Sequence, residues 1–167
     1  MSDTSRHRAG DSVGLSGALT DGPLVTEGPG LLVMDVDSTL IEQEVIELIA
    51  QRAGTRELVA EVTARAMRGE MDFAASLRER VATLAGVCQE VFAEVLAEVR
   101  PTEGAAELIE TLHARGCRVG VVSGGFEEVV VPLAEQLGID HVAANRLEVE
   151  GGRLTGRVLG RIVDRQE

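Results

Sequence analysis

The segment 31–40 constrains the fold of this chain more than any other segment. Four apolar residues run from Leu31 to Met34 without alternation, and the carboxylates Asp35 and Asp37 follow directly. A short unbroken apolar run is typical of a strand buried on both faces, as in a parallel sheet covered by helices. Open α/β sheets bind their ligands at the carboxyl ends of the strands. The segment therefore predicts both a strand and a binding site.

Helical and strand-like patterns alternate along the rest of the chain. Apolar residues at helical spacing fill most of 41–99, and the patterns over 101–115 and 126–137 predict two further helices. The run 117–122 predicts a second strand, and 141–159 predicts a β-hairpin. We therefore expect an α/β fold built on a parallel, Rossmann-like sheet.

The region between the two predicted strands is too long for a simple crossover. Neighbouring parallel strands need a connection of only about a dozen residues. We expect 41–99 to be an inserted helical cap, 30–40 and 100–167 to form the core, and 1–29 to be a flexible leader. A cap placed directly after the carboxylate pair could cover the site and exclude water.

Composition narrows the possible partners and the location. The net charge of −12 argues against binding to nucleic acid or to an anionic membrane. Cys88 and Cys117 are too few for a disulfide framework, which favours reduced thiols. Because the sequence has neither a signal-peptide pattern nor a membrane-spanning apolar run, we expect a cytoplasmic protein.

The carboxylate pair and Ser123-Gly124-Gly125 together predict phosphoryl transfer. One carboxylate can attack a phosphoryl group and form an aspartyl-phosphate, while a second moves a proton to the leaving oxygen and from the attacking water. The Ser-Gly-Gly segment offers a hydroxyl and backbone N–H groups at the start of a helix, which suits an anion. Taken alone, solvated loop acids and an ordinary strand-to-helix turn remain the alternatives.

A divalent cation would relieve the repulsion that this arrangement creates. Two carboxylates beside a phosphate repel one another, and a cation held at Asp35 and Asp37 would offset that charge. Hard oxygen ligands favour Mg²⁺. The histidines have no acidic or cysteine partners at ligand spacing, so we do not expect a zinc site.

The segment 35–41, followed by Glu44, resembles the first motif of the haloacid dehalogenase-like phosphatases, and within them the phosphoserine phosphatase family. Further matches occur in order over about residues 31–165, at 66–69, Phe73, 76–81, 101–104, 121–126 and 144–147. The resemblance implies Mg²⁺-dependent hydrolysis of O-phospho-L-serine to L-serine and phosphate through an aspartyl-phosphate. That reaction is the last step of serine biosynthesis.

The resemblance also implies a role for individual residues at the phosphate end of the site. Asp35 would be the nucleophile and Asp37 the general acid and base, and both would be ligands of Mg²⁺. Ser123 and Gly124 would bind the phosphoryl group.

At the amino-acid end, the resemblance implies that Glu44 faces the substrate ammonium and Arg80 its carboxylate. Met67 and Phe73 would form the apolar lining of the cap. Without the resemblance, exposed helix charges and plain core residues would be the simpler interpretation of these four positions.

Two motifs of this family do not occur in the sequence. One supplies a Lys beside the nucleophile, and the other, of Gly-Asp-Gly-x-x-Asn-Asp type, supplies further ligands for Mg²⁺. The sequence contains no Lys, and by alignment from Ser123 the family's Lys would fall just past Glu167. We therefore expect a C-terminally truncated phosphatase with little or no activity of its own. A related phosphatase with another small substrate and a non-catalytic phospho-ligand-binding module remain alternatives.

Overall fold

The computed structural model describes residues 26–164, so the first 25 residues of the expected leader lie outside the described part. The strands β1 (Leu31–Met34), β2 (Arg118–Phe126), β3 (His141–Glu150) and β4 (Arg153–Leu159) form one sheet in this order. β1, β2 and β3 are parallel, and β4 pairs with β3 in an antiparallel hairpin. The predicted α/β class with a parallel sheet is confirmed, and so is the hairpin.

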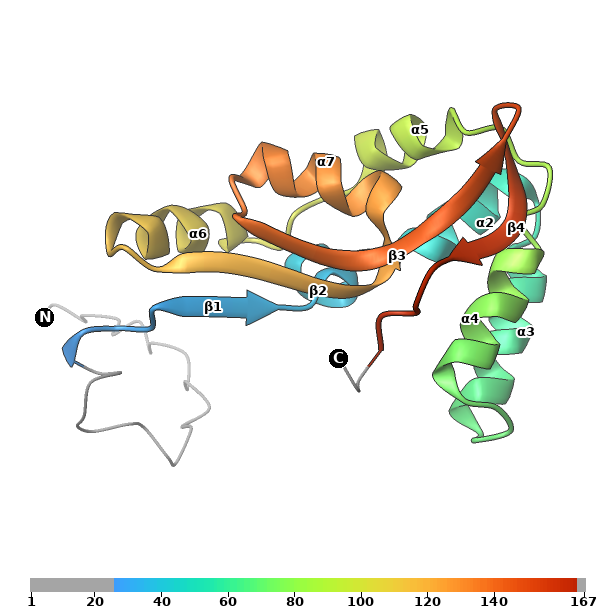
Figure 1. Ribbon diagram of the computed structural model, residues 1–167, viewed down its shortest axis with the longest axis horizontal. Helices are drawn as coiled ribbons and strands as arrows, with labels where there is room; N and C mark the ends of the chain where they lie inside the picture. Colours follow the sequence, from blue (N-terminus) through green and yellow to red (C-terminus); the bar gives the residue numbers. More distant parts are fainter. Residues whose placement is uncertain (1–25, 165–167) are drawn as a thin grey trace, which may run out of the picture.

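Two helices, α6 (Ala105–Ala114) and α7 (Glu127–Leu137), cover the same face of the sheet (Figure 1). Their apolar residues recur at helical spacing and face the strands. The core on this side is made of buried residues from α6, α7 and β2, among them Ile109, Val130 and Val121. These contacts fix the positions of the β1 and β2 ends, where the site lies.

The prediction that β1 is buried on both faces is wrong. Leu31 is 53% exposed and Val33 is 50% exposed, whereas Leu32 and Met34 pack against the core. Val122, on β2, is 40% exposed. Successive side chains of a strand point to opposite faces, and the described helices α6 and α7 cover only one of them. An unbroken apolar run does not reveal how many faces are covered.

Four α-helices lie between β1 and α6, in the expected insertion: α2 (Val45–Ala53), α3 (Arg56–Met67), α4 (Phe73–Ala82) and α5 (Val91–Glu98). The chain enters and leaves this insertion side by side, because Ile41 and Pro101 form an antiparallel bridge. The Glu42 N–H donates to the Arg100 carbonyl at 3.0 Å. These contacts join the two ends of the insertion close to the predicted cap boundaries, 41 and 99. The division into cap and core stays a prediction.

Local capping sets where the cap helices begin and end. Asp72, a residue type typical of N-caps, caps α4, since its carboxylate accepts the Ala75 N–H at 2.7 Å. Gly54 follows α2 with φ of +70°, a conformation that favours glycine. α4 therefore starts at Phe73, next to the site. Among the described residues, none of the helices has the length and apolar character needed to cross a membrane.

Candidate active site

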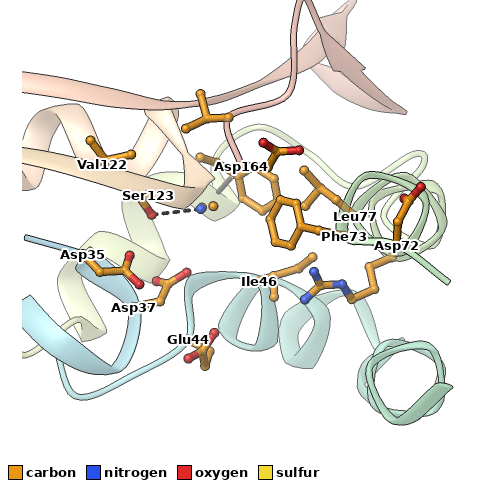
Figure 2. Close-up of a pocket in the computed structure, with 15 residues that line it drawn as sticks. Asp35, Asp37, Glu44, Ile46, Asp72, Phe73, Leu77, Val122, Ser123 and Asp164 are labelled. Carbon is orange, nitrogen blue, oxygen red and sulfur yellow. Dashed lines mark hydrogen bonds between the residues drawn. The ribbon is translucent and has the colours of Figure 1, made fainter. Parts of the chain in front are cut away.

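A cavity of about 660 Å³ lies between the carboxyl ends of β1 and β2 and the cap (Figure 2). Its walls come from the loop after β1, from α2 and α4, from β2, and from the segment that follows β4. The described lining residues are Asp35, Asp37, Glu44, Ile46, Asp72, Phe73, Leu77, Arg80, Val122, Ser123, Gly124, Gly125, Phe126, Val163 and Asp164.

The loop after β1 folds back on itself and brings the two carboxylates together. It forms the single turn η1 (Val36–Leu40), which the Ile41 N–H closes by donating to the Val36 carbonyl at 3.0 Å. Within it Ser38 has φ of +52°, a left-handed conformation that is costly for a residue other than glycine. Figure 2 shows the Asp35 and Asp37 carboxylates side by side as a result.

The environment of Asp37 strongly raises its pKa. Burial raises its pKa to about 7, and the nearby carboxylates of Glu44 and Asp35 add to the rise. The Val45 N–H, at the start of α2, donates to Asp37 Oδ1 at 3.2 Å. This hydrogen bond and the charge of Arg80 lower the pKa of Asp37 and so offset part of the rise. A carboxyl group in this environment can hold a proton near neutral pH.

Glu44 and Arg80 lie at the cap side of the cavity. The Ser38 hydroxyl donates to Glu44 Oε1 at 2.6 Å, so the strained turn also orients Glu44. Burial lowers the pKa of Arg80, while Glu44, Asp37 and Glu47 raise it. Arg80 is the one basic side chain among the described lining residues.

The predicted strand 117–122 ends too early, because β2 continues through Ser123-Gly124-Gly125 to Phe126. The pairing with β3 shifts register between Val122 and Phe126, so the segment is an irregular strand end. Ser123 is 1% exposed, and its Oγ accepts the Gly125 N–H at 2.8 Å.

Both glycines of this segment have neighbours that would crowd a side chain. A Cβ on Gly124 would lie 2.8 Å from Phe73 Cζ. A Cβ on Gly125 would lie 3.1 Å from Asp37 Oδ2 and 3.0 Å from Ser123 Oγ. The bare backbone therefore lets the cap and the carboxylate pair approach β2 closely.

The cavity brings together all the residues predicted for the site except Met67. Met67 is the last residue of α3, is 86% exposed and is not among the lining residues. Phe73 is 41% exposed and does line the cavity, at the first position of α4.

Sequence reasoning missed several lining residues. Leu77 is four positions after Phe73 on α4, so helical spacing could have identified it. Val163 and Asp164 follow β4 in the chain and line the cavity, and no local sequence pattern predicts this contact. Asn145 explains their position, since its side chain donates to the Gly124 carbonyl at 3.0 Å and accepts the Val163 N–H at 2.9 Å.

The donor set agrees with the predicted metal ion in type. In the described part of the chain, no group of three or more His, Cys, Asp or Glu side chains is placed to hold a metal. Asp35 and Asp37 supply two hard-oxygen donors. Mg²⁺ in phosphoryl-transfer sites is commonly held by one or two carboxylates, with water and substrate phosphate as the other ligands.

Comparisons with known proteins agree with this geometry. The family model described as haloacid dehalogenase-like hydrolase matches residues 32–167. A phosphoserine phosphatase of Lactococcus lactis is 57% identical over 136 residues, which cover 81% of this chain and 63% of that protein. One of Streptomyces coelicolor is 62% identical over 135 residues, covering 81% and 33%.

The fold agrees with solved structures as well. A structure described as a substrate-bound phosphoserine phosphatase complex aligns with a TM-score of 0.73 and 44% identity, over 79% of this chain and 63% of that one. A phospho-aspartyl intermediate analogue of phosphoserine phosphatase aligns with a TM-score of 0.73 and 45% identity over the same shares. The chain spans less than two thirds of the length of each of these relatives.

Proposed function

The chain belongs to the haloacid dehalogenase-like hydrolase family, and from this premise we propose that its cavity serves the hydrolysis of O-phospho-L-serine to L-serine and phosphate. The observation that carries the proposal is the set of side chains that line one cavity. Asp35, Asp37 and Ser123 come from the loop after β1 and from β2, and Glu44 and Arg80 come from the start of α2 and from α4. The named activity of the relatives supports the choice of substrate.

The reaction requires two displacements at phosphorus. Asp35 attacks the phosphoryl group, a bond forms between its carboxylate oxygen and phosphorus, and the bond from phosphorus to the serine oxygen breaks. Asp37 gives its proton to that oxygen. A water then attacks the aspartyl-phosphate, Asp37 takes a proton from it, and the bond to Asp35 breaks. Asp37 suits both steps because its pKa is raised to about 7.

Charge and polarity support an amino acid as the leaving group. A zwitterion needs an acid for its ammonium and a base for its carboxylate, which Glu44 and Arg80 provide. Phe73 and Leu77 offer apolar contact beside them. Asp35 and Asp37 would hold Mg²⁺, which when bound offsets the negative charge of the phosphate. Met67 stays a predicted cap contact.

The proposal is tested by Mg²⁺-dependent phosphate release from O-phospho-L-serine. We expect slow turnover, because Arg80, the one basic side chain among the described lining residues, is assigned to the substrate carboxylate and leaves the phosphate without a cationic side chain there. Asp35→Asn should abolish release, and Asp37→Asn should lower it roughly a hundredfold or more. Release that survives Asp35→Asn would contradict the assignment of the nucleophile, and binding of phosphoserine without turnover would favour a binding module.

The substrate is tested separately with phosphoethanolamine, which lacks the carboxylate. Arg80→Gln should weaken phosphoserine binding roughly tenfold or more and leave phosphoethanolamine unaffected, because it removes a charged hydrogen-bond donor. Arg78→Gln is the matched control, since Arg78 is an exposed residue of the same helix. Equal effects on both ligands would point to a different small phosphomonoester.

The cytoplasmic location expected from the sequence is part of the same proposal. Cys88 and Cys117 are both free thiols, Cys88 exposed and Cys117 buried. Free thiols of this kind are typical of proteins in a reducing compartment.

A further inference from the structure

Strand β4 bulges in the middle of the hairpin. Val149 pairs with Leu154 and Leu147 pairs with Val158, so the segment 155–157 lies opposite Glu148 alone. Gly156, at the centre of this bulge, has φ of +83°. Extra residues on one strand bend it and turn it away from its partner.

Glu148 holds both sides of the bulge. Its Oε2 accepts the Thr155 hydroxyl at 2.6 Å and the Arg157 Nε–H at 2.6 Å. The two hydrogen bonds to one carboxylate oxygen fix the residues that flank Gly156. The bulge is therefore a held conformation of the strand.

The bulge contacts the C-terminal end of α4 at very short range. A Cβ on Gly156 would lie 3.1 Å from Ala85 Cβ and 3.3 Å from the Cα and carbonyl oxygen of Ala82. Next to this contact the backbones are joined, since the Gly86 N–H donates to the Leu154 carbonyl at 2.7 Å. The end of α4 is thus attached to the hairpin at a point with no space for a side chain.

The same helix carries residues of the candidate active site. Phe73, Leu77 and Arg80 follow one another at helical spacing and line the cavity. α4 is a continuous helix of ten residues, about 15 Å long, so a shift at its C-terminal end moves these side chains as well. At the other end, Phe73 lies over Gly124.

We propose that the β4 bulge at Gly156 is a positioning element that sets where α4 holds Arg80 and Phe73 over the cavity. The identity of the ligand in this inference rests on the proposed function, whereas the attachment of α4 does not. Gly156 touches no substrate and acts through the helix. Any side chain there displaces α4 by a few tenths of an ångström, because two of the contacts are with backbone atoms.

The attachment is tested by amide hydrogen exchange of residues 73–82 in the 167-residue chain. Gly156→Ala should increase exchange across α4. Gly116→Ala is the matched control, because Gly116 has φ of +75° and a Cβ there would meet nothing within 4 Å. The same exchange rates for α4 in both variants would overturn the proposal. Gly156→Asn is the second variant. Asn tolerates positive φ, so this variant keeps the steric clash of a Cβ with less backbone strain.

The positioning role is tested by calorimetric titration with O-phospho-L-serine and with inorganic phosphate. Gly156→Ala and Gly156→Asn should weaken phosphoserine binding roughly three- to tenfold, because Arg80 is displaced, and leave phosphate binding unchanged. Equal weakening of both ligands would contradict a positioning role. If the unmodified chain binds neither ligand, the proposed function fails, and the exchange of α4 still decides the attachment.

Discussion

Gly124 lies where Phe73 of the cap contacts β2, and its missing side chain makes that contact possible. The Phe73 ring lies over it, with Cζ 2.8 Å from where a Cβ would stand. Because Gly124 has no side chain, the proposed function leaves phosphate binding at this position to Ser123 and to backbone N–H groups. A methyl group at this position would push the ring aside and narrow the cavity.

We therefore expect Gly124→Ala to weaken O-phospho-L-serine binding roughly tenfold or more, since misplacement by an ångström is costly in a site of this kind. Stability should change little, because Phe73 is 41% exposed and its ring can swing outward. Gly120→Ala is the matched control on the same strand, where the nearest atom to a new Cβ is 3.5 Å away. Wild-type affinity in Gly124→Ala, measured by titration calorimetry, would contradict this account.

The residues of the site differ in how far the sequence could predict them. Asp35, Asp37 and Glu44 follow one strand within ten positions, and the short loop η1 alone brings them together. Val163 and Asp164 line the cavity, and the Val163 N–H donates a long-range hydrogen bond to Asn145 Oδ1. No spacing rule predicts a contact of that kind, because it depends on the path of the whole hairpin.

At the level of elements, apolar spacing and capping residues predict where the helices begin and end. The ends of the strands depend on pairing with neighbouring strands, which the sequence pattern does not show. Asp72 caps the start of α4 and Gly54 caps the end of α2, positions at which these residue types are common. β2 extends beyond Val122 because its pairing with β3 resumes at Phe126. The two glycines between these residues do not predict that the strand continues. The bulge at Gly156 is likewise visible only in the register of β3 against β4.

Glu128, in the first turn of α7, gives a prediction for stability against pH. Its Oε1 accepts the Leu147 N–H at 2.9 Å, but Oε2 is buried without a hydrogen-bond partner, and burial raises the pKa of this carboxyl. A raised pKa in the folded state means that the charged form costs stability as pH rises above the unfolded value of about 4.3. Below that pH the cost disappears.

Glu128→Gln should therefore raise the free energy of unfolding by about 1 kcal/mol at pH 7, because it removes an unsatisfied charged acceptor. The difference from the unmodified chain should vanish as pH falls to 4. Denaturant unfolding at both values measures this, with Glu110→Gln on an exposed position of α6 as the control. If Glu128→Gln instead lowers the free energy of unfolding at pH 7, the charged Glu128 carboxylate stabilises the fold, and the prediction is wrong.

At the scale of the whole molecule, the sheet has one covered face and one exposed face. α6 and α7 lie on the same side of it in Figure 1, and Leu31, Val33 and Val122 are exposed on the described part of the other side. Neighbouring apolar side chains in contact with water favour association with other surfaces.

We expect the chain to self-associate through this face as its concentration rises. Replacing Leu31 and Val33 together by Thr should shift sedimentation toward the monomer and change the free energy of unfolding by less than about 0.5 kcal/mol, since both side chains are already exposed. Leu32→Thr, on the opposite face of β1, should instead destabilise the fold and leave association unchanged. Association that persists in the double variant would assign it to another surface.

The central claim is that Asp35 is the nucleophile of a phosphoserine phosphatase site. Acid quenching of the chain with O-phospho-L-serine and Mg²⁺, followed by peptide mass spectrometry, tests it most directly, because an aspartyl-phosphate that forms slowly is still trapped. We predict one added phosphoryl group on Asp35, increased in Asp37→Asn, where breakdown lacks its base, and absent in Asp35→Asn. A phosphoryl group on another residue, or none while phosphate is released, would contradict the account.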